Sequence, residues 1–131
     1  MNLILKKVKE PLIVLVSFII YIFNQKIYRP QVFSNSESNE YLVFILGIIP
    51  NFLGSIMTFL TCLFLFKLEN KKSIRKIIIT SFLITLALVI FMELERFINQ
   101  NMKFDFFDML ASILALIICL IFYKKELKFY D

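Results

Sequence analysis

The chain has 131 residues, of which 60% are hydrophobic and 19% are charged, and its formal net charge is +5. A soluble domain usually carries about 45–50% apolar and about 25% charged residues, so this composition, with its apolar residues gathered in long runs, argues against a soluble protein and for membrane helices. The basic residues lie between those runs, where they act as topology signals, so nucleic acid is not an expected partner.

The first apolar run covers residues 11–23 and is short for a membrane span, which needs about 20 residues. Because lysine side chains can extend to the interface and Tyr28 suits that position, we expect the span to cover about residues 8–28. Pro11 then falls in the first helical turn, where its missing N–H costs little. We expect residues 29–40 to form a polar loop.

The second run, residues 41–66, contains no charged residue and is the clearest membrane span in the sequence. Pro50 interrupts this run. Because a residue before proline avoids helical dihedral angles, we expect a kink or a break near Ile49.

Two further apolar runs are expected to form the third and fourth membrane spans. A basic loop at residues 67–76 leads to a third span at about residues 77–97, and a polar turn then leads to a fourth span at about residues 104–123. The expected fold is therefore all-α: one transmembrane domain, residues 1–131, with four membrane-spanning helices.

Lysine and arginine are divided unevenly between the two ends of these spans. Three lie in the N-terminal segment, five in the loop at 67–76 and three at the C-terminus, against four in the first and third loops. The positive-inside rule then predicts cytoplasmic termini for a multi-pass membrane protein, in the inner membrane if the chain is bacterial, with a basic face that contacts anionic lipids. If the first run only lay in the interface, three spans would remain and the termini would fall on opposite sides.

Small and polar residues recur at intervals of three and four along each run, which places them on one face of each helix. Because lipid is as apolar as leucine, membrane helices pair through such residues. We therefore expect these stripes, and the cysteines within them, to face inward, and most of the 16 phenylalanines to face lipid. The stripes are Ser17, Tyr21, Asn24 and Tyr28; Gly47, Asn51, Gly54, Ser55, Thr58 and Cys62; Ser81, Thr85, Glu93, Arg96 and Gln100; and Asp108, Ala111, Ser112, Ala115 and Cys119.

Five polar residues lie toward the outer ends of their spans: Asn24, Asn51, Glu93, Arg96 and Asp108. A charge at the bilayer centre costs about 2.5–3.5 kcal/mol on insertion scales, and less near the interface. Glu93 and Asp108 are therefore either solvated interfacial charges, with Glu93 paired to Arg96, or part of a shallow polar pocket that opens outward. A metal site or a catalytic carboxylate pair is a weaker hypothesis, because the chain has no histidine. We assign no cofactor, metal or catalytic residue.

The stretch between these two acids has a distinctive order. Glu93 ends one span, a short polar turn follows, and Asp108 opens the next span with the sequence DMLAS. Over about residues 77–123 this order resembles the VanZ-like family of small bacterial membrane proteins. The resemblance implies a polytopic envelope protein, with a link to glycopeptide resistance in the namesake and no established catalytic residue.

Three positions depart from the pattern of that family. Arg96 stands where the family often has glutamine, Ser112 stands where it has asparagine, and Ala115 stands where it has glycine. A basic residue is usual in the turn, and Lys103 is the candidate for it here.

Three functions compete at this point. The first is a non-enzymatic membrane protein whose outer pocket binds an amphiphile or a lipid head group. The second is a small accessory subunit that docks onto a larger membrane protein or onto copies of itself. The third, an enzyme acting on a lipid-linked substrate, is disfavoured because the sequence offers no nucleophile set, phosphate loop or metal cluster.

Overall fold

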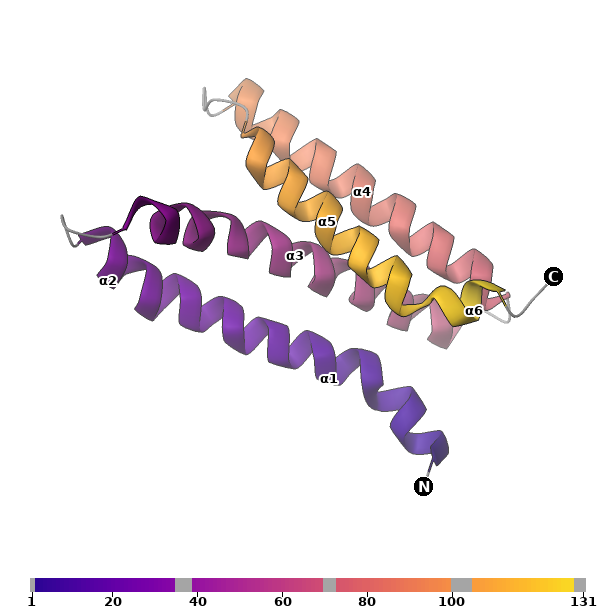
Figure 1. The fold of residues 1–131 in the computed structure, drawn as a ribbon. Coiled ribbons are helices and arrows are strands. Elements are labelled where there is room, and N and C mark those ends of the chain that lie inside the picture. The colour runs from indigo at the N-terminus through magenta and orange to yellow at the C-terminus, as the bar shows by residue number, and fades with distance from the viewer. Residues whose placement is uncertain (1, 35–38, 70–72, 100–104, 129–131) are drawn as a thin grey trace.

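The computed structural model describes residues 2–34, 39–69, 73–99 and 105–128, with side chains from residue 9 onward (Figure 1). These residues form helices without any strand, which confirms the all-α class. In chain order the elements are α1 (Asn2–Phe23), η1 (Asn24–Tyr28), α2 (Arg29–Ser34), α3 (Glu40–Glu69), α4 (Ile74–Asn99), α5 (Phe106–Phe122) and α6 (Lys124–Lys128).

Three stretches are long and apolar enough to cross a membrane: Lys9–Ser34, Glu40–Glu69 and Ile74–Asn99. The fourth apolar helix, α5, has only 17 residues. At 1.5 Å per residue it measures about 26 Å, slightly less than a hydrocarbon core of about 30 Å. The helices thus have the length and composition of a membrane protein, with three full-length candidate spans and one shorter helix.

The first span differs from expectation at both ends. Residues 29–34 are helical rather than part of a loop, because η1 is a π-helical turn that carries α1 directly into α2. In this turn the backbone N–H of Arg29 donates to the carbonyl of Asn24, five residues earlier. The expected position of Pro11 is also wrong: α1 begins at Asn2, so Pro11 lies inside the helix.

Pro50 does not break α3, which runs without interruption from Glu40 to Glu69. A proline inside a helix removes the hydrogen bond to the carbonyl four residues earlier, which here belongs to Leu46. The side-chain amide of Asn24 on η1 donates to that carbonyl at 3.5 Å. A neighbouring helix thus provides a partner for the carbonyl that the proline leaves free.

Helix α3 is the centre of the bundle and packs against α1, α4 and α5. In Figure 1, α1 lies on one side of α3 and the pair α4–α5 on the other. Among the described residues the backbone of α1 does not come close to that of α4 or α5. The start of α1, the end of α3, the start of α4 and α6 lie at one end of the bundle, and α2, the start of α3, the end of α4 and the start of α5 lie at the other end (Figure 1).

The core confirms most of the inward-facing stripes. Ser17, Ser55, Ser81, Thr85 and Ala115 are among the buried stripe residues, and Cys62 and Cys119 are both free thiols. The main apolar cluster joins α3, α4 and α5. Its buried members are Phe59, Leu60, Leu63, Ile77, Ile78, Leu116, Cys119 and Tyr123.

Some members of the predicted pattern behave differently. Tyr28 is exposed, and Phe59 is fully buried although most of the phenylalanines that the structure describes are exposed. Gly47 and Gly54 do not bring helices into close contact, since a Cβ atom at either position would meet no heavy atom within 4 Å. The first half of α3 therefore has open space beside both glycines.

Candidate polar pocket between α1 and α4

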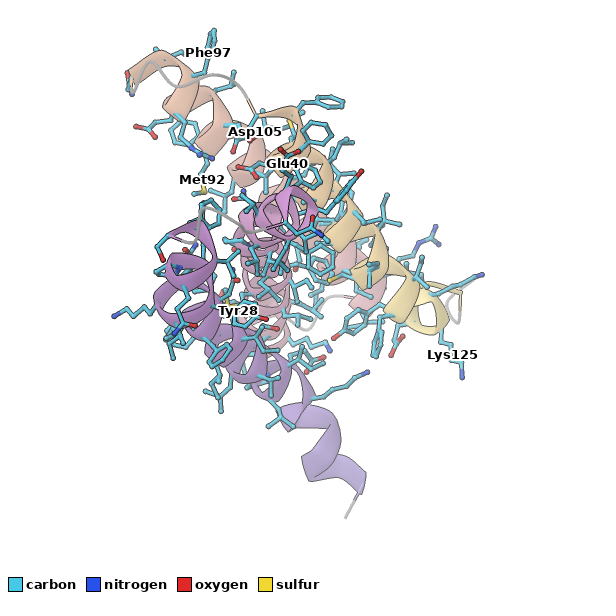
Figure 2. The ribbon with its side chains drawn as sticks, turned by 60° about the vertical axis from the view of Figure 1, so that its left-hand side comes forward. Tyr28, Glu40, Met92, Phe97, Asp105 and Lys125 are labelled. Atoms are coloured by element: carbon cyan, nitrogen blue, oxygen red, sulfur yellow. The ribbon has the colours of Figure 1, made fainter. Side chains whose placement is uncertain are left out.

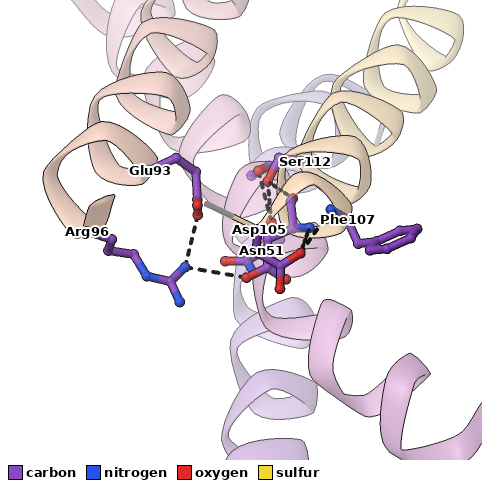
Figure 3. A network of polar contacts seen from close by, with 8 residues as sticks. Asn51, Glu93, Arg96, Asp105, Phe107 and Ser112 are labelled. Atoms are coloured by element: carbon purple, nitrogen blue, oxygen red, sulfur yellow. Dashed lines mark hydrogen bonds and ion pairs between the residues drawn. The ribbon is translucent and has the colours of Figure 1, made fainter. Parts of the chain in front are cut away.

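The start of α5 is fixed by Asp105. Its Oδ1 atom accepts hydrogen bonds from the backbone N–H of Phe107 at 2.9 Å and of Asp108 at 3.3 Å (Figure 3). This is an N-cap, and a carboxylate in the first turn of a helix is further stabilised by the helix dipole. The cap therefore sets the orientation of Asp108, which faces the end of α4.

Arg96 joins the two acids that the sequence singled out. Its Nη1 atom donates to Glu93 Oε1 at 2.9 Å and to Asp108 Oδ2 at 3.4 Å (Figure 3). Glu93 is only 6% exposed and Asp108 only 8%, whereas the side chain of Arg96 is 36% exposed. The expected pairing of Glu93 with Arg96 is confirmed, and the same guanidinium also bridges α4 to α5. We call Glu93, Arg96 and Asp108 the outer triad.

Ser112 connects α5 to α3 beside the outer triad. Its hydroxyl donates to the backbone carbonyl of Asp108 at 3.1 Å and lies 3.4 Å from the carbonyl of Asn51 (Figure 3). Asn51 follows Pro50 on α3, so this contact brings the proline-containing turn next to the triad. Three helices therefore meet at this point: α3, α4 and α5.

A cavity of about 310 Å³ begins at this junction and extends along α3 between α1 and α4. Among the described residues the lining comes mainly from α3 and α4, with Tyr21 contributed by α1 and Ser112 by α5. We call this space the α1–α4 groove. Its lining residues are Tyr21, Pro50, Asn51, Gly54, Ser55, Met57, Thr58, Thr85, Leu88, Val89, Met92, Glu93, Arg96 and Ser112.

The five candidate residues from the sequence are placed as follows. Asn51, Glu93 and Arg96 line the groove, and Asp108 contacts Arg96 without being part of the lining. Asn24 lies outside the lining and is engaged with the backbone of α3. Gln100 and Lys103 lie outside the described residues.

The apolar wall of the groove and the Asp105 cap of α5 were not predicted from the sequence. Met57, Leu88 and Met92 line the groove, although they carry no small or polar signal. The sequence does contain a signal for the cap. Asp105 precedes the apolar run and Asp108 follows three residues later, a pattern typical of a helix start.

A second polar cluster, absent from the sequence-based candidates, lies at the opposite end of the bundle. Glu10 on α1 is 3% exposed; it forms an ion pair with Lys67 of α3 and accepts a hydrogen bond from the Tyr123 hydroxyl at 3.0 Å. The ammonium of Lys9 lies 4.6 Å from the ring centre of Phe122, close enough for a cation–π contact. We call Glu10, Lys67 and Tyr123 the inner clasp.

The two clusters lie at different ends of the molecule. Phe97, Glu40 and Asp105 mark the end that carries the outer triad, and Lys125 marks the end that carries the inner clasp (Figure 2). Neither cluster has the composition of a metal site: no three acidic, histidine or cysteine side chains of the described residues gather where one ion could be held.

Comparison with models of protein families, with curated proteins and with solved structures finds no match for this chain.

Proposed function

We propose that this chain is a non-enzymatic, VanZ-like, multi-pass protein of the bacterial inner membrane, with four spans and cytoplasmic termini, that binds the head group of an amphiphile or lipid in the α1–α4 groove. Helix α5 serves as the fourth span, because Asp105 caps one of its ends and Tyr123 with Lys124 and Lys125 follows the other, as interfacial residues should.

The proposed topology is supported by charge. The N-terminus, the α3–α4 connection and the C-terminus are the three lysine-rich segments of the sequence, and α1, α4 and α6 begin at the same end of the bundle (Figure 1). The basic end then faces the anionic lipids of the cytoplasmic leaflet, and the outer triad faces the exterior.

The observation that carries the proposed function is that the lining of the α1–α4 groove is divided between charged and apolar side chains. The end of the groove near Asn99 carries Glu93 and Arg96, and its wall carries Leu88, Val89 and Met92. A molecule that enters from the membrane would thus find charge beside its head group and apolar surface beside its chain. Without the apolar wall, the site would consist only of the two ion pairs that Arg96 makes with Glu93 and Asp108.

Gly54 offers a direct test because it lines the groove and a Cβ atom there meets nothing within 4 Å. The substitution Gly54→Leu should fill the groove without touching the outer triad. Gly47→Leu is the matched control, since Gly47 also has open space around it but is not among the lining residues. The purified proteins are incubated with phospholipid that carries a photoactivatable acyl chain, and the cross-linked peptides are mapped by mass spectrometry.

The wild type and Gly47→Leu should cross-link at peptides of α1 and α4 that border the groove, and Gly54→Leu should lose about tenfold in yield there. Equal yields in all three proteins would contradict the proposal. So would a stoichiometric protein partner that co-purifies in mild detergent and protects the groove from cross-linking; in that case the accessory-subunit function would take its place.

A further inference from the structure

We infer that the head group recognised in the α1–α4 groove is zwitterionic, with a primary ammonium next to a phosphate, as in an ethanolamine phospholipid. This inference rests on the proposed function, because it names the ligand class of the same groove. The ammonium would lie against Glu93, and the phosphate against Arg96.

The charge of the outer triad points to a cation as one half of the ligand. Two carboxylates face a single guanidinium, so the triad carries a net charge of −1. The contact of Glu93 with Arg96 is made through Oε1, and the Glu93 side chain is only 8% exposed and lines the groove. A buried carboxylate whose charge is not fully compensated is costly, and a ligand cation would supply the missing positive charge.

Arg96 points to an anion as the other half. Both of its ion pairs use the same nitrogen, Nη1, so the other donors of the guanidinium are not occupied by these acids (Figure 3). The planar guanidinium matches the geometry of phosphate and binds it through paired hydrogen bonds. Arg96 is the most exposed member of the triad and lines the groove, so we infer that the donors not used by the two acids are offered to the ligand.

The kind of cation follows from the lining. A primary ammonium donates three N–H groups, which suits carboxylate acceptors. A quaternary ammonium has no N–H group and is recognised by the faces of several aromatic rings, but Tyr21 is the single aromatic residue among the lining residues of the described chain. An anionic glycerol head group has no cation to offer and would be repelled by the net charge of the triad.

The test uses the full-length protein and three photoactivatable phospholipids with identical acyl chains and ethanolamine, choline or glycerol head groups. We expect cross-linking in the groove to fall by about tenfold from ethanolamine to choline and further for glycerol. Glu93→Gln should remove the preference for ethanolamine over choline, because it takes away the negative charge but keeps an oxygen acceptor for Arg96. Glu40→Gln is the control, an exposed carboxylate at the same end of the bundle.

The outcomes separate the two proposals. Cross-linking in the groove with the glycerol lipid at or above the ethanolamine lipid would overturn the inference and leave the proposed function standing. Cross-linking of none of the three lipids in the groove would overturn the proposed function itself. The comparison of the three lipids on the wild type decides between these outcomes even if Glu93→Gln does not fold.

Discussion

The inner clasp and the outer triad are both built from a buried acid and a basic residue, yet their polar groups are satisfied to different degrees. In the inner clasp a single acid, Glu10, receives both an ammonium and a hydroxyl donor. In the outer triad two acids share one nitrogen of Arg96. The first arrangement pairs one acid with one base, whereas the second has one more acid than base among the described residues.

The two clusters also join different helices. The inner clasp links α1, α3 and the end of α5, so it closes the bundle where the lysines gather. The outer triad links α4 to α5 and leaves α1 apart, which is why the α1–α4 groove exists at that end. The inner clasp therefore connects three helices at one end, whereas the outer triad connects two helices at the other end, where we propose that a ligand binds. Substitutions in the inner clasp should therefore affect stability, and substitutions in the outer triad should affect binding.

The largest effect is expected for Glu10→Ala. This change leaves the buried Tyr123 hydroxyl without its acceptor and Lys67 without its ion-pair partner. Breaking such a pair should reduce the free energy of unfolding by about 3 kcal/mol, measured by thermal or denaturant unfolding in detergent. Lipid cross-linking in the α1–α4 groove should persist at temperatures where the variant is folded. A stability loss no greater than that of Glu40→Gln would contradict the role of the clasp.

Tyr123→Phe should have a smaller effect on the same clasp. It removes one hydrogen bond to the charged Glu10 but retains the ion pair with Lys67 and the ring packing against Phe59. We expect a loss of about 1.5 kcal/mol in the same unfolding assay. In the background of Glu10→Ala the second substitution should cost much less, because the acceptor is already gone. Additive losses would show that Tyr123 and Glu10 act independently.

The clasp was also the part of the molecule that the sequence revealed least. Apolar runs located the four main helices, and the spacing of small residues identified the buried faces, because both are local patterns. The partners of Glu10 lie 57 and 113 residues away in the chain, and no local pattern encodes such a pairing. A signal was nonetheless present: one acid beside Pro11 in a lysine-rich segment needs a partner once its helix is buried.

The candidate site was easier to predict from the sequence, since Arg96 and Asp108 are only 12 positions apart and Glu93 lies three positions before Arg96. The predictions that failed near the site concerned Pro50 and the ends of the helices. Pro50 alone predicts a kink or a break, but α3 runs from Glu40 to Glu69, and Asn24 donates a hydrogen bond to the Leu46 carbonyl that the proline leaves free. That tertiary contact also accounts for the position of Asn24 outside the groove.

Asp105→Ala should weaken the outer end by a moderate amount. The substitution removes the acceptor for the N–H groups of Phe107 and Asp108, and the loss of an N-cap costs about 1 kcal/mol. Because the cap also orients Asp108, lipid cross-linking in the groove should fall as well. Asp105→Asn should recover most of the stability, since asparagine is an equally good cap. Equal losses in both variants would mean that charge, rather than capping, is the important property.

The smallest effect, of opposite sign, is expected for Gly47→Ala. A Cβ atom at this position meets nothing within 4 Å, so the substitution should raise the free energy of unfolding by about 0.8 kcal/mol through helix propensity alone. The unfolding assay used for Glu10→Ala measures this gain. A lower free energy of unfolding would mean that the space beside Gly47 is filled, which would contradict the loose packing described for this half of α3.

The orientation of the two ends is tested most directly by single cysteines in a chain whose Cys62 and Cys119 are replaced by alanine. The proposed topology predicts that Asn99→Cys reacts with a membrane-impermeant maleimide applied to intact spheroplasts, and that Lys125→Cys reacts only after the membrane is permeabilised. Reaction of both cysteines from the same side would place the outer triad and the lysine-rich end on one face of the membrane, and would contradict the proposed outward-facing pocket.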